Sequence, residues 1–471
     1  MNNEGNTPPQ LQRVITGIPG LDAITGGGFL QSGVYILQGA PGAGKTILAN
    51  QIVHRHAAAG GHVVYVTMLA ESHGRLLQHM QSFAFFDTDA LPEKVYYVSA
   101  FDALRSDGLK GVVELLRKEM RTRQAGIVVL DGLVMAASAA ASEEELKLFV
   151  SDIQVHSTLT GSTTLLLTSE DADRPVSAEQ TMVDGILLLR ERPFGPRRER
   201  NIEVVKFRGS STLRGNHAFQ IGPGGITVYP RLETARRDAA DDAVQPVGVP
   251  TGVHGLDALF DIGGYGKGSV TVITGPSGAG KTALALHFVA QATPADKALY
   301  FSFYESPALL LRTMEVLGVP RPADDAVEFR WQPFGENVLD RMAAELLERV
   351  AATGASRVVI DGAGGFMAAP AFPERGGPFL AALADELRRL GATTLVTLEE
   401  GEARDTRMLD TPTMSALADA TLKLSVTSED SIRRFLAIRK ARISRHDVRV
   451  RELVLTERGI ALVPEDLDLA P

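Results

Sequence analysis

Two glycine-rich loops, each ending in a lysine and a threonine, are the segments of this sequence whose residue types point most directly to chemistry. They read GAPGAGKT over residues 39–46 and GPSGAGKT over residues 275–282, and both fit G-x-x-x-x-G-K-[ST]. In such a loop backbone N–H groups point inward at phosphate oxygens, and the lysine reaches the outer phosphates. Two nucleoside-triphosphate sites are therefore predicted. The expected ATP-binding residues are Gly39, Pro41, Gly42, Ala43, Gly44, Lys45, Thr46, Gly275, Ser277, Gly278, Ala279, Gly280, Lys281 and Thr282.

A magnesium ion is expected beside each loop. The hydroxyls of Thr46 and Thr282 are predicted Mg²⁺ ligands, as the threonine of this motif usually is. Asp131 and Asp361 each end an apolar run, where a carboxylate would hold the ion through its waters. An aspartate at the end of a strand is by itself more often part of a turn. The loop upstream in each half favours the metal role.

Hydrolysis of a triphosphate also needs a group that orients or deprotonates the attacking water. A Glu-Ser pair follows the second apolar run of each half, with Glu71 in the first and Glu305 in the second. One positioned carboxylate can activate water, so these two glutamates are the candidate catalytic residues. The alternative is that each only begins a helix, where an acidic side chain is favoured.

The same features recur at a nearly constant offset along the chain. The offset is 281 − 45 = 236 for the loop lysines, 361 − 131 = 230 for the aspartates and 257 − 22 = 235 for a Leu-Asp pair before each loop. Such spacing indicates a tandem duplication. The polar seam ETARRDAADDAVQPVG, residues 233–248, is predicted to be an exposed linker. The expected domains are 13–232 and 249–464, with a disordered segment 1–12 and a tail 465–471.

Short apolar runs alternate with segments of helical periodicity in each half. In the first half the runs are VYILQG, HVVYVTM, KVYYVSA, GIVVLDG, TTLLLTS and DGILLLRE. Nearly continuous runs of this length suit strands that are buried on both faces, as in a parallel sheet. Ser142 with Glu145 forms a capping box that marks one helix start. The predicted fold is α/β: two tandem domains, each a mostly parallel sheet flanked by helices with a C-terminal antiparallel β extension.

Composition narrows the class of protein. The 471 residues are 44% hydrophobic and 22% charged with a net charge of −9, so no overall positive field recruits nucleic acid or an anionic membrane. There are no cysteines, which excludes disulfides and thiolate metal sites. Neither a signal peptide nor a run of eighteen apolar residues is found, and a cytoplasmic location without membrane attachment is expected.

Together these features resemble the KaiC family of circadian-clock ATPases, which belongs to the RecA/RadA-like branch of P-loop ATPases. The resemblance spans roughly residues 12–460 and rests on GLDAITGGG, the two loops, the Glu-Ser segments and VVKFRGSSTLRGNHAFQIGPGGITVYP (204–230). It implies two RecA-like domains that bind ATP with Mg²⁺, hydrolyse it and assemble into a homo-oligomeric ring, a hexamer in the family. It also implies regulatory output through a protein partner.

The chain departs from the family pattern at the catalytic glutamates. Family members carry two adjacent glutamates, whereas Ala70 precedes Glu71 and Tyr304 precedes Glu305 here. Each site therefore keeps only the second carboxylate, and slow turnover is expected.

In the family, a Lys-x-Arg pair on a strand reaches the phosphates bound by a neighbouring subunit, much like an arginine finger. The matching residues here are Lys206 with Arg208 and Lys440 with Arg442, at an offset of 440 − 206 = 234. Taken alone, such pairs are typical of an exposed strand with alternating charges. Their recurrence beside the other motifs favours the role across an interface.

The second domain of family members also phosphorylates a Ser-Thr pair near the subunit interface. In the matching stretch LDTPTMSALADATLKL (409–424), Ser415 takes the serine position and Ala416 replaces the threonine. Ser415 is therefore the candidate phosphoacceptor of a serine autokinase activity. The alternative is an ordinary solvated serine.

Two other function classes share the core fold. A DNA-dependent recombinase or helicase is disfavoured by the acidic balance and by the segments after Asp131 and Asp361, which offer little for a phosphate backbone or for base stacking. Nucleic acid is accordingly not expected as a partner. A non-catalytic scaffold that nucleotide locks would bind ATP without producing ADP.

Overall fold

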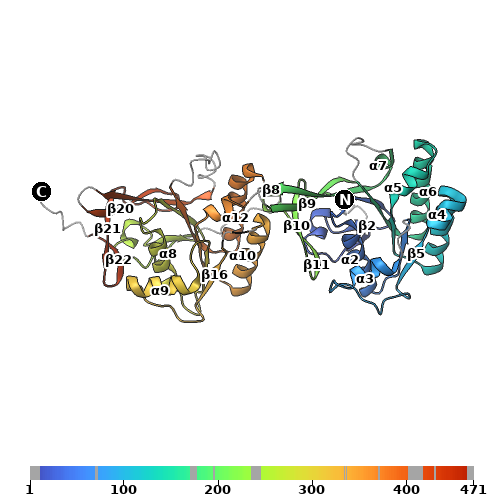
Figure 1. Ribbon diagram of the computed structural model, residues 1–471. Coiled ribbons are helices and arrows are strands. Elements are labelled where there is room, and N and C mark those ends of the chain that lie inside the picture. The colour runs from blue at the N-terminus through green and yellow to red at the C-terminus, as the bar shows by residue number, and fades with distance from the viewer. Residues whose placement is uncertain are drawn as a thin grey trace, which may run out of the picture. The chain divides into compact units, whose positions relative to one another are not determined.

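The computed structural model describes residues 11–68, 73–169, 178–194, 197–234, 245–333, 335, 337–369, 372–400, 417–428 and 431–463. The chain divides into two compact units, Met1–Ala235 and Arg236–Pro471. In Figure 1 each unit is a sheet with helices packed on it, and the first unit is coloured blue to green. Within the described ranges, every helix is too short or too polar to cross a lipid bilayer.

A single large sheet organises the first unit. Its strands are β3 (Val34–Gly39), β4 (Val63–Thr67), β5 (Val95–Ser99), β6 (Ile127–Asp131), β7 (Thr163–Thr168), β8 (Gly185–Phe194), β9 (Arg197–Phe207), β10 (His217–Gly222) and β11 (Gly225–Tyr229). The spatial order is β11-β10-β9-β8-β3-β7-β6-β4-β5. Strands β8 to β5 in this order are parallel, and β9, β10 and β11 continue the sheet antiparallel. A mostly parallel sheet with an antiparallel extension is the predicted arrangement.

Helices connect these strands. They are α1 (Leu21–Thr25), α2 (Lys45–Ala58), α3 (His73–Met80), α4 (Phe101–Arg123), α5 (Leu133–Ala139), α6 (Glu143–Thr160) and α7 (Ala178–Met182), and the short strands β1 (Arg13–Val14) and β2 (Phe29–Leu30) pair near the N-terminus. The cap predicted at Ser142 is present, since its hydroxyl accepts a hydrogen bond from the Glu145 amide at 3.1 Å. The Glu145 carboxylate returns to the Ala141 amide at 2.7 Å, so α6 begins where the sequence indicated.

The second unit repeats this topology. Its sheet has the order β16-β15-β17-β18-β14-β19-β20-β21-β22. The strands are β14 (Val270–Gly275), β15 (Ala298–Ser302), β16 (Val327–Trp331), β17 (Arg357–Asp361), β18 (Thr393–Glu399), β19 (Ala420–Ser428), β20 (Ile432–Ala441), β21 (Arg451–Thr456) and β22 (Gly459–Leu462). The helices are α8 (Lys281–Ala290), α9 (Pro307–Leu317), α10 (Leu339–Thr353), α11 (Gly364–Met367) and α12 (Gly376–Arg389). Position by position, β14 corresponds to β3 and β17 to β6.

The linker prediction and the structure differ at one end. Residues 245–248 of the predicted linker belong to β12 (Gln245–Val249), which pairs antiparallel with β13 (Tyr265–Lys267). Pairing of Gly248 with Gly266 brings two glycines together, where no side chain interferes with the close approach of the chains. Polar composition alone did not reveal this pairing.

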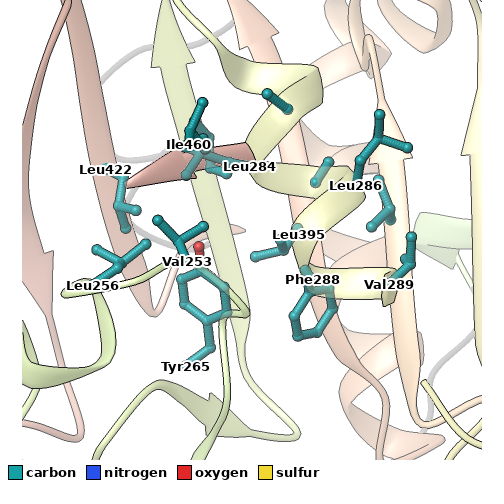
Figure 2. Close-up of a cluster of buried hydrophobic side chains, with 14 of the residues drawn as sticks. Val253, Leu256, Tyr265, Leu284, Leu286, Phe288, Val289, Leu395, Leu422 and Ile460 are labelled. Carbon is teal, nitrogen blue, oxygen red and sulfur yellow. The ribbon is translucent and has the colours of Figure 1, made fainter. Parts of the chain in front are cut away.

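The continuous apolar runs are explained by burial on both faces of the sheet. In β3, Tyr35 and Leu37 join the cluster that contains α2, whereas Val34 and Ile36 join the cluster that contains α4 and α6. Side chains of a strand point alternately to opposite faces, so both sets must be apolar. Figure 2 shows the corresponding packing around α8 in the second unit, where Leu284 and Phe288 lie among Tyr265, Leu395 and Leu422.

In each unit one polar side chain ties the helix that follows the phosphate loop, α2 or α8, to the last strand of the sheet. Gln51 bonds both backbone groups of Ile226, at 3.1 Å and 2.7 Å. His287 occupies the matching position, because 287 − 51 = 236. Its Nε2 accepts from the Ile460 amide, and its Nδ1 lies 3.0 Å from the carbonyl oxygen of Gly252. These two bonds need a neutral ring, and burial lowers the pKa of His287.

We predict that the second unit loses stability in acid through His287. Unfolded histidine binds a proton below about pH 6.5, whereas the folded ring with its lowered pKa resists protonation, so the free energy of unfolding should fall as the pH drops through this range. The variant His287→Gln, which copies Gln51, should make the second unit less sensitive to pH. Urea unfolding between about pH 5 and pH 8 measures how steeply the free energy of unfolding changes with pH in the wild-type chain and in the variant. Identical slopes in the two proteins would refute the assignment.

Candidate active site

Each phosphate-binding loop connects a central strand to the helix that follows it. Strand β14 ends at Gly275 and α8 begins at Lys281; β3 ends at Gly39 and α2 begins at Lys45. The backbone φ is +103° at Gly44 and +102° at Gly280, a conformation that glycine adopts without strain. The helix N-terminus therefore faces the loop, with its free N–H groups available to an anion.

The loop lysines fold over their own loops. Lys45 Nζ donates to the carbonyl oxygens of Gly39 and Ala40 at 2.6 Å and 3.0 Å. Lys281 Nζ donates to those of Gly275 and Pro276, both at 2.9 Å. Burial lowers the pKa of Lys45, and the charge of Asp131 opposes this shift. An ammonium has three donors, so one remains for a phosphate oxygen.

The strand-end aspartates lie against the loop threonines, as the metal hypothesis requires. Thr282 Oγ1 donates to Asp361 Oδ2 at 3.0 Å, and Thr46 Oγ1 lies 3.4 Å from Asp131 Oδ2. A hydroxyl beside a carboxylate is the oxygen ligand set that suits Mg²⁺, which takes its other ligands from water and substrate phosphates. The two pairs therefore fit the ion predicted from the sequence.

A buried tyrosine completes each pair, and the sequence reasoning missed it. Tyr65 OH donates to Asp131 Oδ2 at 2.9 Å, and Tyr300 OH donates to Asp361 Oδ2 at 2.6 Å. Burial raises the pKa of Asp131, while the hydrogen bonds from Tyr65 and Thr46 lower it. The signal in the sequence is a tyrosine at the centre of two matching apolar runs, VVYVT and ALYFS.

A cavity of about 530 Å³ opens over the second loop and brings the predicted residues together. Besides loop residues 277–282, its walls include Glu305, Asp361, Glu399 and Arg434. Apolar side chains of α9, β21 and β22 form another part of the wall: Leu317, Leu453, Val454, Leu455 and Ile460. The volume falls in the range of small-molecule sites.

Glu305 lines the cavity from the turn after β15. Its backbone amide donates to Ser302 Oγ at 3.0 Å, which fixes the turn after β15. Its Oε2 is buried and has no hydrogen-bond partner among the described residues. Burial raises the pKa of Glu305, and the nearby charge of Asp361 raises it further. A carboxylate with a raised pKa and a free oxygen can take a proton from water. Glu71 and Ser415 lie outside the described residues.

The Lys-x-Arg pairs lie away from the loops of their own unit. Ile186 pairs with Lys206 across β8 and β9, which places Lys206 beside the start of β3. Lys206 is thus level with Ile36, and the loop begins at Gly39, three residues or about 10 Å further along the strand. Lys206 donates to the carbonyl oxygens of Gln180 and Thr181 at 3.0 Å and 2.9 Å.

The second pair repeats this placement. Lys440 donates to the carbonyl oxygen of Ala418 at 2.7 Å, and Arg442 lies 3.8 Å from Asp419, as Arg208 does from Asp184. Both pairs are thus at the opposite end of the sheet from their own site.

Arg434 is a further cavity residue that the sequence reasoning did not select. It lies on β20, and its Nε donates to the carbonyl oxygen of Gly278 in the loop at 2.9 Å. The matching residue of the first unit is Arg200, because 434 − 200 = 234, and Arg200 lies 3.4 Å from Glu191. The constant offset would have identified these two arginines as one repeated position. Their contacts differ between the units.

The ATPase domain of KaiC matches residues 14–233 and again residues 249–466. This chain belongs to the KaiC family of ATPases. The resemblance seen in the sequence is thereby confirmed, together with the fold of two tandem RecA-like domains.

Relatives match over much of the chain. The circadian clock oscillator protein KaiC of Prochlorococcus marinus is 24% identical, over 97% of this chain and 93% of that protein. The circadian clock protein KaiC2 of Synechocystis sp. is 26% identical, over 95% and 81%. The circadian clock oscillator protein KaiC of Parasynechococcus marenigrum is 28% identical over 67% of this chain, and the match spans 63% of that protein.

We predict that each loop lysine is required for nucleotide binding at its own site. The wild-type chain should bind two ATP analogues, Lys45→Ala and Lys281→Ala one each, and the double variant none, because removal of the ammonium leaves the outer phosphate charge uncompensated. Isothermal titration calorimetry gives the stoichiometry. The exposed Lys147 on α6 provides the control, Lys147→Ala, which should bind two. Full stoichiometry in the double variant would rule out the phosphate-loop assignment.

Proposed function

We propose that this protein is a KaiC-type regulatory ATPase that binds Mg-ATP at both loops and hydrolyses it slowly. The observation that carries the proposal is the cavity in which loop residues 277–282, Asp361 and Glu305 meet. The first unit has the same loop, lysine, threonine and strand-end aspartate. In the first unit we assign the role of Glu305 to Glu71, on the basis of the sequence repeat alone.

The residues of the second site have separate tasks. The loop amides, Lys281 and the α8 N-terminus bind the phosphates, and Thr282 with Asp361 would hold Mg²⁺. When bound, the ion neutralises charge that develops on the phosphate oxygens. Glu305 accepts a proton from water as the water oxygen attacks the γ-phosphorus and ADP leaves. A single glutamate without an adjacent carboxylate is consistent with slow turnover.

We further propose that the Lys-x-Arg pairs act on the site of a neighbouring copy. Lys206, Arg208, Lys440 and Arg442 are at the opposite end of each sheet from their own loop. A cation supplied across an interface makes hydrolysis depend on assembly. The family resemblance suggests a ring of six copies.

A regulatory role is supported by the relatives, which carry the names of clock proteins. A slow ATPase suits such a role, because nucleotide state can report to a protein partner through a change in assembly. The cytoplasm is the proposed location.

We also propose a serine autokinase activity, on the ground that Ser415 aligns with the family's phosphoserine position. If it occurs, the purified chain incubated with Mg-ATP should gain one phosphate on Ser415. Peptide mass spectrometry measures this, and Ser415→Ala should remove the modification. Phosphate on another residue, or on none, would contradict the assignment.

We predict that Glu305→Gln retains ATP but loses hydrolysis at the second site. In the Lys45→Ala chain, which isolates that site, the rate of ADP production should fall by about 10²–10⁴-fold, the usual contribution of a general base. Because Glu305 must be ionised to act, the parent's rate should decline with falling pH at values above 4.5, the ordinary glutamate pKa. Glu348→Gln, an exposed glutamate on α10, is the matched control. An unchanged rate in Glu305→Gln would exclude this glutamate from the mechanism.

We also predict that assembly depends on Mg-ATP and on the cation pairs. Light scattering should show a higher mass with Mg-ATP than without, and the double variant Lys440→Ala, Arg442→Ala should lower that mass, because the bridging charges are lost. Arg439→Ala removes an exposed arginine of the same strand and should assemble normally. Equal mass with and without nucleotide would contradict the proposal.

A further inference from the structure

One buried position beside the metal-site aspartate differs between the two units. It is Leu167 on β7 of the first unit and Thr397 on β18 of the second, since 397 − 167 = 230, the offset of the aspartates themselves. Asp131 pairs directly with Leu167 in the sheet. Ile360 pairs with Val396, so Asp361 and Thr397 follow one step further along β17 and β18. Both side chains at this position are 1% exposed.

Thr397 connects the aspartate to the backbone of the following turn. Its hydroxyl donates to Asp361 Oδ1 at 2.5 Å and accepts a hydrogen bond from the Gly362 amide at 2.8 Å. Because the Thr397 oxygen accepts the hydrogen bond from the Gly362 amide, its own hydroxyl proton points toward the carboxylate. Leucine has no group that could make either contact.

The two aspartates are therefore held differently. Tyr300 and Thr282 bond Oδ2 of Asp361 while Thr397 bonds Oδ1, so both carboxylate oxygens are fixed. At Asp131 the described hydrogen bonds, from Tyr65 and Thr46, both end on Oδ2. A carboxylate bonded through one oxygen can still turn about its Cβ–Cγ bond, whereas one bonded through both cannot.

We propose that Thr397 is a positioning residue that presents Asp361 to a divalent cation, and that Leu167 leaves the first site with weaker cation binding. The inference rests on the proposed function of both loops as Mg-nucleotide sites. Partners that orient a metal-binding carboxylate typically change metal affinity 10–100-fold when they are removed. The two units would consequently fill with Mg-nucleotide at different free Mg²⁺ concentrations, the second before the first.

The experiment compares the sites in the full-length chain, with Mn²⁺ as a paramagnetic probe and ADP as the nucleotide. Lys45→Ala isolates the second site and Lys281→Ala the first. Electron paramagnetic resonance then gives the Mn²⁺ dissociation constant without requiring hydrolysis. The second site should bind Mn²⁺ about tenfold more tightly than the first.

Substitutions at the differing position then test the cause. In the Lys45→Ala chain, Thr397→Val should weaken Mn²⁺ binding about tenfold and Thr397→Ser should keep it, because serine retains the hydroxyl. In the Lys281→Ala chain, Leu167→Thr should tighten Mn²⁺ binding, a gain that misfolding cannot imitate. Thermal unfolding of each variant establishes that it is folded.

Three outcomes decide the matter. Weakening in Thr397→Val with retention in Thr397→Ser supports the proposal. The proposal is overturned if folded Thr397→Val binds Mn²⁺ as tightly as its parent, or if Thr397→Ser binds it as weakly as Thr397→Val. In either case, ADP binding measured in EDTA would show that the nucleotide sites are intact and that the proposed function stands. Absence of ADP binding by the unsubstituted chain, with or without metal, overturns the proposed function as well.

Discussion

The second site depends on one buried carboxylate, that of Asp361, and on the hydroxyl groups that surround it. Removing a charged carboxylate from water is costly unless hydrogen bonds replace the lost hydration. At Asp361 these bonds come from three elements: Thr282 on α8, Tyr300 on β15 and Thr397 on β18. The parallel register brings the carboxyl ends of the strands to one edge of the sheet. Satisfying a single charge therefore ties the phosphate loop to the sheet and fixes the geometry of the site.

The tandem duplication allows each unit to serve as a reference for the other. The Asp22 and Asp257 carboxylates accept from the amides of Thr16 and Thr251 at 2.9 Å and 2.8 Å, so the Leu-Asp lead-in has one structural role in both. Other positions keep the contact but change the chemistry. Gln51 and His287 both bond the last strand, yet only the histidine is an ionisable side chain. At the position of Leu167 and Thr397 only the threonine of the second unit makes the contact, because leucine has no polar group. The units thus share a scaffold but differ in how tightly they hold their polar groups.

Much of this fold could be predicted from the sequence because the continuous apolar runs and the glycine-rich loops are each compatible with few structures. Two-sided burial forces a continuous run such as VYILQG, and the loop pattern fixes the strand-to-helix turn. The same reasoning missed Tyr65, Tyr300 and Thr397, since a polar group inside an apolar run looks like core until its partner is known. It also missed Arg434, whose role depends on how β20 passes the loop, and the pairing of β12, which depends on the distant β13.

The position of the Lys-x-Arg pairs constrains any assembly in which they act. The Lys-x-Arg pairs and the phosphate loop lie on different surfaces, at opposite ends of the same sheet. A copy that donates its cations to one neighbour therefore receives cations from another neighbour on its other surface. Such a contact is heterologous, and heterologous contacts either close into a ring or continue as an open filament. A ring leaves every site with a donor, whereas a filament of finite length leaves the sites of the copy at one end without donors. If hydrolysis depends on Lys440 and Arg442, closure is therefore the arrangement in which all copies are equally active.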